Sequence, residues 1–289
     1  MAAIPRLNGI IRALERRQHA FATFATTDLD TVLALGASRY DGLVFEAEHN
    51  VWDGRALRDA LQYLLNRRQI AEAGSVAPAV TPIVRIPPNG SEMNQVYAKQ
   101  ALDLGAYGIV WPHVSTAAQA HNAVASCRYP RLRDAPRYEP AGQRGDGPAA
   151  AVRYWGLTQE DYYRRADVWP LDPEGEILVI LMIEDRQGIA NLDEMLRQVP
   201  GIGAVLIGEG DLSQELGHPR QYDHPVVRSA MAEIVGICKA HGVVVGHPHV
   251  GQGNLQRVLD EGYRFLMCAP VRSYGALDAG LRLAGRAGE

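Results

Sequence analysis

The chain has 289 residues, of which 47% are hydrophobic, and a formal net charge of −4 at pH 7. Its basic residues are scattered, which argues against nucleic acid or an anionic membrane as a partner. Its three cysteines are odd in number and far apart, which argues against a disulfide framework and favours a reducing compartment.

The apolar segments are short throughout. The N-terminal residues, MAAIPRLNGIIRALERR, lack the long apolar stretch of a signal peptide. No apolar run approaches the roughly 18 residues that a membrane-spanning helix needs. We therefore expect a cytoplasmic protein that does not cross a membrane.

Eight short apolar runs alternate with helical patterns along the chain. The runs cover residues 21–26, 42–49, 81–86, 108–114, 177–185, 204–211, 243–249 and 265–270. The spacing of apolar residues and glycine stops predict helices within 55–73, 91–106, 191–199, 224–242 and 254–263. Continuous apolar strands that alternate with helices are typical of a parallel sheet covered by helices. Eight repeats favour a closed α/β fold, a (β/α)8 TIM barrel, with a doubly wound open sheet as the alternative.

Residues 128–176 interrupt this alternation. The segment is rich in Arg, Pro, Gly and Tyr and has no strand-like run. Connections this long inside a compact domain are usually functional or disordered, and the aromatic residues favour order. We expect one domain over residues 1–289 with a long inserted loop at about 128–176. This loop could cover the C-terminal mouth of the barrel or reach a neighbouring subunit.

The positions of the lysines bear on the chemistry. The chain has only two, Lys99 and Lys239, and both lie in helical patterns rather than at strand ends. A Schiff-base mechanism needs a lysine inside the pocket. Carbanion chemistry in this chain therefore needs another electron sink, most simply a metal ion.

Glu184 and Asp211 end the fifth and sixth apolar runs. Neighbouring strands of a barrel bring such residues to one end, so both carboxylates can face one point. Hard divalent cations such as Mg²⁺ prefer oxygen ligands of this kind. The alternative is that each residue caps the helix that follows it.

Arg85 and His49 end the third and second runs. Arg85 offers a permanent charge to a carboxylate or a developing enolate oxygen, and its alternative is an ion pair within the barrel. His49 is a candidate general base that Glu46 or Glu48 could orient; its alternative is a structural histidine. Asp103 could join this network or simply end a helix.

Three further histidines and a glycine-flanked turn complete the candidates. His113, His247 and His249 lack recognised zinc spacing, so we expect substrate contacts or loop structure from them. In IGEGDLS, glycines bracket Glu209 before a predicted helix. Exposed amides at such a turn can hold a carboxylate, or the glycines can serve packing alone.

Five segments in the same order resemble the HpcH/HpaI aldolases. This family contains metal-dependent, class II pyruvate aldolases such as 4-hydroxy-2-oxoheptanedioate aldolase, within the phosphoenolpyruvate/pyruvate barrel group. The segments are FEAEHN, PIVRIPPN, LDLGAYGIVWPHV, LMIEDRQGIANLDE and IGEGDLSQELG. The resemblance extends from about residue 20 to about residue 280, and five motifs in register make it specific.

The resemblance implies a catalytic mechanism. Glu184 and Asp211 would hold a divalent metal ion, most simply Mg²⁺, with Mn²⁺ or Co²⁺ as alternatives. Pyruvate would chelate that ion, and Arg85 would stabilise the enolate oxygen. His49, supported by Asp103, would move the proton during C–C cleavage or condensation.

The resemblance also implies the substrate contacts. Amides around Gly210, Asp211 and Leu212 would hold the pyruvate carboxylate. Glu209 stands where the family carries proline and His113 where it often carries methionine, so these two side chains could bind a polar or cationic group on an unusual substrate. Met182 replaces a family glutamine, and Ala47 replaces a glycine.

The resulting expectation is a lyase that reversibly cleaves a 4-hydroxy-2-oxo acid into pyruvate and an aldehyde. The resemblance implies a trimer or hexamer in which a C-terminal helix is exchanged between subunits. One alternative is related enolate chemistry, as in an acyl-CoA lyase or a 2-oxo acid decarboxylase, where the arginines between 128 and 165 would bind the phosphates of CoA. The second alternative is a catalytically inactive barrel that is used for binding.

Overall fold

The computed structural model describes residues 4–270 and 275–283. Within them, eight parallel strands close into a barrel, because β1 pairs with β9 and β4 pairs with β6. The barrel strands are β1 (Ala20–Ala25), β2 (Gly42–Glu46), β3 (Thr81–Arg85), β4 (Gly108–Trp111), β6 (Ile177–Ile183), β7 (Ala204–Ile207), β8 (Val244–His247) and β9 (Phe265–Met267). Each overlaps one of the predicted apolar runs. The (β/α)8 barrel is therefore confirmed, and the open sheet is wrong.

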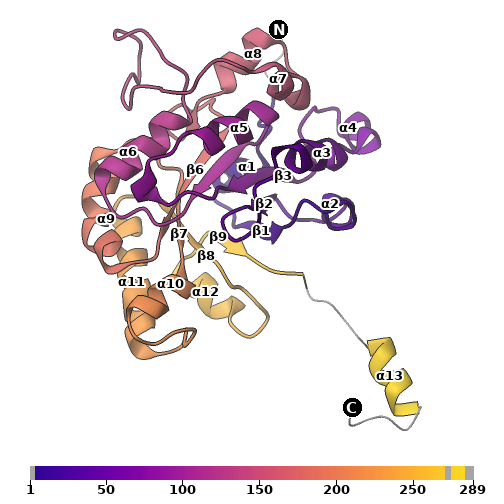
Figure 1. Ribbon diagram of the computed structural model, residues 1–289, viewed down its shortest axis with the longest axis vertical. Helices are drawn as coiled ribbons and strands as arrows, with labels where there is room; N and C mark the ends of the chain where they lie inside the picture. Colours follow the sequence, from indigo (N-terminus) through magenta and orange to yellow (C-terminus); the bar gives the residue numbers. More distant parts are fainter. Residues whose placement is uncertain (1–3, 271–274, 284–289) are drawn as a thin grey trace.

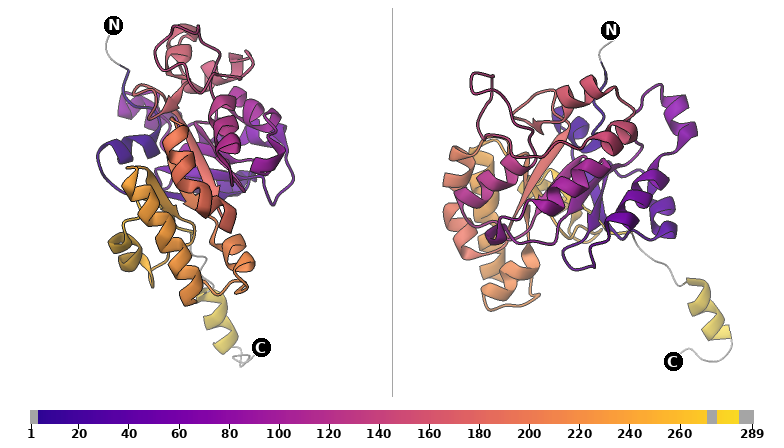
Figure 2. Two further views of the ribbon diagram at one scale, coloured as in Figure 1. Left: turned by 90° about the vertical axis from the view of Figure 1, so that its left-hand side faces the viewer. Right: turned by 45° about the horizontal axis from the view of Figure 1, so that its top comes forward.

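Helices form a layer around these strands (Figures 1 and 2). They are α2 (Leu29–Gly36), α3 (Gly54–Leu64), α4 (Arg67–Ala73), α5 (Val96–Leu104), α6 (Ala117–Ser126), α9 (Arg186–Gln198), α10 (Glu209–Glu215), α11 (Pro225–Ala240) and α12 (Leu255–Glu261), with a 3-10 turn η1 (Gly90–Glu92). Helical spacing explains the burial of α3, whose inward residues are Leu57, Ala60, Leu61 and Leu64. Truncating Leu61 to alanine would cost about 2–5 kcal/mol.

Helix α1 (Gly9–Glu15) closes the N-terminal end of the barrel. The amide of Gly9 donates a 2.7 Å hydrogen bond to Thr81 Oγ1 at the start of β3. A side chain at Gly42, the first residue of β2, would lie 2.4 Å from Ile10. Glycine at that position lets α1 pack directly on the strands. The strand ends beneath α1 are therefore covered by this helix.

The segment 128–176 is folded rather than an open loop. It contains α7 (Ala149–Trp155), α8 (Gln159–Arg165) and the short strand β5 (Val168–Trp169), which pairs with the first residues of β6. The Trp155 ring stacks on Tyr107 at a centroid distance of 4.3 Å. Because Tyr107 precedes β4, the helices pack beside the N-terminal ends of the strands. The expectation that the segment could cover the C-terminal mouth of its own barrel is wrong.

Helix α13 (Gly275–Leu283) stands apart from the barrel (Figures 1 and 2). The predicted exchange of a C-terminal helix falls on this element and on residues 284–289, which lie outside the described part of the chain. Within the described residues, no helix is long and apolar enough to cross a membrane.

Candidate functional site

A cavity of about 330 Å³ opens at the C-terminal ends of the strands. Its walls come from β1, β3 and β6 and from the segments that follow β2, β7 and β8. The lining residues are Phe24, His49, Arg85, Met182, Glu184, Gly208, Glu209, Gly210, Asp211, Gln214, Arg220, Tyr222, Pro248 and His249. Larger hollows elsewhere on the surface gather fewer of the predicted residues, so the chemistry identifies this cavity as the site.

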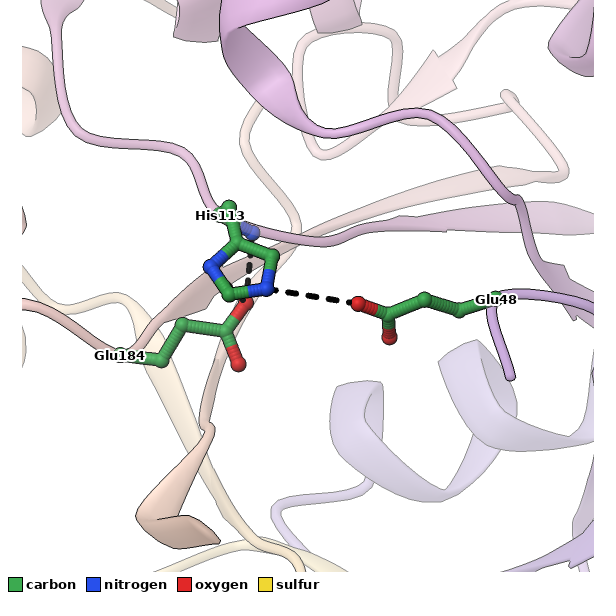
Figure 3. Close-up of side chains that lie close together, drawn as sticks. All are labelled: Glu48, His113 and Glu184. Carbon is green, nitrogen blue, oxygen red and sulfur yellow. Dashed lines mark hydrogen bonds and ion pairs between the residues drawn. The ribbon is translucent and has the colours of Figure 1, made fainter. Parts of the chain in front are cut away.

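Three side chains converge at one wall of the site (Figure 3). Ligand atoms of Glu48, His113 and Glu184 all lie within 4.8 Å of one another. The ring of His113 lies between the two carboxylates, 3.5 Å from Glu48 Oε1 through Nε2 and 3.6 Å from Glu184 Oε1 through Nδ1. Glu184 Oε2 is buried without a hydrogen-bond partner. A buried, unpaired carboxylate oxygen beside two further donors fits a hard divalent cation.

Burial and mutual contact shift the protonation of this cluster. Burial raises the pKa of Glu184 to about 7, against the opposing effect of His113. The hydrogen bond to Glu48 raises the pKa of His113 to about 9. Burial pushes the pKa of Glu48 upward, but His113 and Arg85 outweigh it and lower that pKa. The carboxylates therefore lie in a setting where a positive charge stabilises their ionised form.

Arg85 links two carboxylates at the end of β2, Glu46 within the strand and Glu48 after it. Its Nε lies 2.7 Å from Glu46 Oε2, and its Nη1 lies 2.9 Å from Glu48 Oε2. The guanidinium also lies over the Phe24 ring, 4.5 Å from the centroid. The predicted ion pair within the barrel therefore exists, yet Arg85 still lines the cavity. One arginine can both fix the turn after β2 and face a ligand.

Glu46 and Glu48 have roles that sequence reasoning missed. Glu46 Oε1 accepts the amides of Glu48 and His49 at 2.8 and 3.1 Å, so it shapes the turn and does not orient the His49 ring. Glu48 belongs to the three-residue cluster. The signal available in the sequence was the pair of carboxylates, two residues apart, at a strand end.

Helix capping does not account for Glu184 or Asp211. Asp185 caps α9 through its side chain, and Gly208 occupies the N-cap of α10. Asp211 lines the cavity and raises the pKa of Glu184 through its charge, although it stands outside the three-residue cluster. The capping alternative is thus wrong for both residues.

The first turn of α10 is only partly as expected. Gly210 and Asp211 line the cavity, and no earlier backbone carbonyl of this helix is available to their amides. Leu212, in contrast, is fully buried, and its amide donates to the Gly208 carbonyl at 3.0 Å. The prediction that Leu212 contacts substrate is therefore wrong, because the helix itself satisfies the backbone amide of Leu212.

His49 and Asp103 are not brought together. His49 lines the cavity with its side chain 64% exposed, and its Nε2 lies 3.6 Å from Glu48 Oε2. Asp103 lies on α5, where Arg144 pairs with it at 2.8 Å, and it faces a different hollow beside Trp52. Within this protomer, Asp103 cannot support His49 directly.

The remaining predicted residues form a second polar group. His249 Nδ1 lies 2.5 Å from Glu209 Oε1, and His247 Nε2 lies 3.9 Å from Glu209 Oε2. His247 is buried, and this burial lowers its pKa. Because only the His249 nitrogen is in bonding range of Glu209, the arrangement is a histidine–carboxylate pair.

Comparison with known proteins adds independent findings. The profile of the HpcH/HpaI aldolase/citrate lyase family matches residues 24–269. The chain is 32% identical over 239 residues to hydroxypyruvate/pyruvate aldolase from Roseobacter denitrificans, which covers 83% of this chain and 81% of that protein. It is 30% identical over 232 residues to 5-keto-4-deoxy-D-glucarate aldolase from Escherichia coli, covering 80% and 78%. An HpcH/HpaI aldolase/citrate lyase family protein from Burkholderia cenocepacia shares the fold, with a TM-score of 0.73 over 97% of each chain at 24% identity.

Proposed function

Because the chain belongs to the HpcH/HpaI aldolase/citrate lyase family and is a carbon–carbon lyase, we propose that it reversibly cleaves a 4-hydroxy-2-oxo acid into pyruvate and an aldehyde. The observation that carries the proposal is the buried, unpaired Glu184 oxygen, in a cavity that also holds Arg85 and Asp211. Aldolase relatives support the reaction class, and the absence of a pocket lysine from the lining residues supports a metal-dependent route.

The donor set fits a divalent ion, for which we propose Mg²⁺, with Mn²⁺ and Co²⁺ as substitutes. Glu184 and Asp211 would hold it, and Glu48 lies close enough to Glu184 to act as a further donor. Such an ion, when bound, supplies positive charge where the keto oxygen of a 2-oxo acid becomes negative.

The chain's own residues would bind the 2-oxo acid and move its proton. Arg85 would stabilise negative charge on the keto oxygen, because its guanidinium is permanently charged and lines the cavity. The amides of Gly210 and Asp211 would bind the carboxylate. His49 would exchange a proton with the methyl carbon of pyruvate, since an imidazole can both accept and donate a proton and this side chain is exposed to the cavity.

Part of the segment that motivated the acyl-CoA alternative is committed to other contacts. Three of its arginines are buried in ion pairs: Arg128 with Asp167 at 2.7 Å, Arg144 with Asp103 at 2.8 Å, and Arg165 with Glu176 at 2.6 Å. These cations stabilise the inserted segment and are not free to bind phosphates.

The test is exchange of the methyl protons of pyruvate for deuterium, followed by NMR in D₂O. We expect exchange with Mg²⁺ or Mn²⁺, loss of exchange with EDTA, and loss of exchange in the D211A variant. The H49A variant should slow exchange while it still binds Mn²⁺. If no divalent ion supports exchange by the native enzyme, pyruvate is the wrong nucleophile.

We also infer a homo-oligomer built through α13. Leu277 and Leu283 of this helix are 57% and 90% exposed, and the helix stands apart from the barrel. Apolar side chains in that setting favour burial against another subunit. Sedimentation velocity should give a trimer or hexamer, and truncation after residue 270 should lower the oligomeric state; a monomer for the full chain would refute the inference.

A further inference from the structure

A buried carboxylate and a histidine from neighbouring strand ends meet inside the cavity. Glu209 begins α10, directly after β7, and only 3% of its surface is exposed. His249 follows β8, and its Nδ1 lies 2.5 Å from Glu209 Oε1. Both side chains line the cavity that also contains Glu184 and Arg85. The mechanism proposed above uses neither residue.

Several contacts hold the His249 ring in one orientation. Tyr222 stacks on it, with centroids 5.5 Å apart and planes 16° from parallel. The His249 amide donates to His247 Nδ1 at 3.2 Å, and Asn254 Nδ2 donates to the His249 carbonyl at 2.9 Å. Nδ1 is thus occupied and the backbone is fixed. Among the described residues, nothing bonds to Nε2, and 59% of the side chain is exposed.

A histidine whose Nδ1 is held by a buried carboxylate is suited to proton transfer at Nε2. The carboxylate fixes the tautomer and the ring orientation and stabilises the imidazolium that forms. The other two histidines at the site are arranged differently. The nitrogens of His113 face Glu48 and Glu184, and His49 has only a 3.6 Å contact to Glu48.

We propose that His249 is the acid–base residue for the aldehyde half of the reaction and that Glu209 is its positioning residue. The inference rests on the proposed aldol chemistry and deepens it. In cleavage, His249 Nε2 takes the proton of the 4-hydroxyl group. The C3–C4 bond breaks as the C4 carbonyl forms, and the bonding electron pair moves into the enolate of pyruvate. In condensation, the imidazolium returns that proton to the new alkoxide.

This assignment divides two proton transfers between two walls of the cavity. The methyl carbon of pyruvate would exchange its proton with His49, after β2. The hydroxyl of the aldehyde half would exchange its proton with His249, after β8. The two proton transfers can be measured separately. Methyl exchange needs no aldehyde and depends only on the transfer by His49, whereas cleavage depends on both transfers.

The experiment compares the H249N and E209Q variants with the native enzyme in both assays, each with Mg²⁺. Cleavage is measured with whichever of 4-hydroxy-2-oxopentanoate and 5-keto-4-deoxy-D-glucarate the native enzyme cleaves faster. The matched control is H241N, since His241 Nε2 also pairs with a carboxylate, Asp193, at 2.8 Å, but on the outer surface between α11 and α9.

We expect H249N to lower kcat for cleavage by about 100-fold or more, with KM and the rate of methyl exchange within about threefold of native. E209Q should lower kcat less, and it should add nothing in the H249N background, because it acts through His249. Imidazole should restore part of the cleavage activity of H249A. H241N should behave as native.

Two results would overturn the assignment. Unchanged kcat for cleavage in H249N removes His249 from the reaction. Equal losses in cleavage and exchange mean that the substitution damages the whole site. Failure of the native enzyme to catalyse methyl exchange is a different outcome, which refutes the proposed function and this assignment with it.

Discussion

The backbone amide of His113 donates a 2.5 Å hydrogen bond to Glu184 Oε1, so the residue after β4 positions the carboxylate after β6. His113 adopts a φ of 51°, a left-handed conformation that is uncommon outside glycine. Its ring lies against the same carboxylate. One oxygen of Glu184 is therefore fixed by the backbone while the other is left for a ligand.

Replacing Glu184 with glutamine should abolish metal binding without unfolding the barrel. The amide keeps the shape but removes the charge that a divalent cation needs. Burial already raises the pKa of Glu184 to about 7, so a neutral group at this position is compatible with the fold. Calorimetry with Mn²⁺ should show at least about 100-fold weaker binding. The control E194Q, on the exposed face of α9, should bind as native; equal affinity in E184Q would exclude Glu184 as a ligand.

Gly208 and Gly210 offer a steric test of the same site. A Cβ at Gly208 would lie 2.6 Å from Glu184 Cβ, whereas a Cβ at Gly210 would meet nothing within 4 Å. G208A should therefore displace Glu184 and weaken Mn²⁺ binding by about 10-fold or more, and G210A should leave that affinity unchanged. Native-like Mn²⁺ affinity in G208A would show that Glu184 is not held as described.

Arg85→Lys should lower activity strongly even though the substitution keeps the positive charge. Lysine keeps the charge but cannot contact Glu46 and Glu48 at once while it faces a ligand. We expect kcat/KM for cleavage to fall by about 100-fold, with circular dichroism unchanged. Arg58→Lys is the control, because Arg58 pairs with Asp59 on the exposed surface. Full activity in R85K would reduce Arg85 to a structural ion pair.

The cysteines should differ in reactivity. Burial raises the pKa of Cys127 and of Cys238 to about 12, so at pH 8 only about one thiol in 10⁴ is ionised at each. Cys268 is half-buried, with a smaller upward shift in its pKa. Mass spectrometry after iodoacetamide treatment at pH 8 should find Cys268 modified in the native protein and all three modified in urea. Alkylation of native Cys127 would contradict its burial.

The sequence predicts the barrel well because its signal is local. Buried parallel strands read as continuous apolar runs, and β6 is buried along all seven residues. Nearly every run also ends in a charged or ring-nitrogen side chain at the same end of the sheet, which places the cavity correctly. The helices of the inserted segment escaped prediction because α7 and α8 have only seven residues each and depend on long-range partners such as Tyr107.

The contacts between polar side chains were harder to predict from the sequence. Glu46 ends β2, and Glu48 and His49 follow it. Nothing in their spacing says that both glutamates pair with Arg85 or that Glu48 also joins His113. Asp103 looked available to His49, but the inserted segment brings Arg144 to it. The Leu212 amide was expected to bind substrate, but α10 begins at Glu209, so this amide donates to the Gly208 carbonyl within the helix.

The sequence by itself determined the fold, the end of the barrel that carries the chemistry, and the residue types present there. Hydrophobic periodicity depends on neighbours along the chain, so one sequence suffices to read it. Only the tertiary structure decided that Glu48, His113 and Glu184 converge and that Glu209 holds His249. Such pairings depend on the angles and separations of different strands, to which ångström-scale contacts are sensitive and local sequence patterns are not.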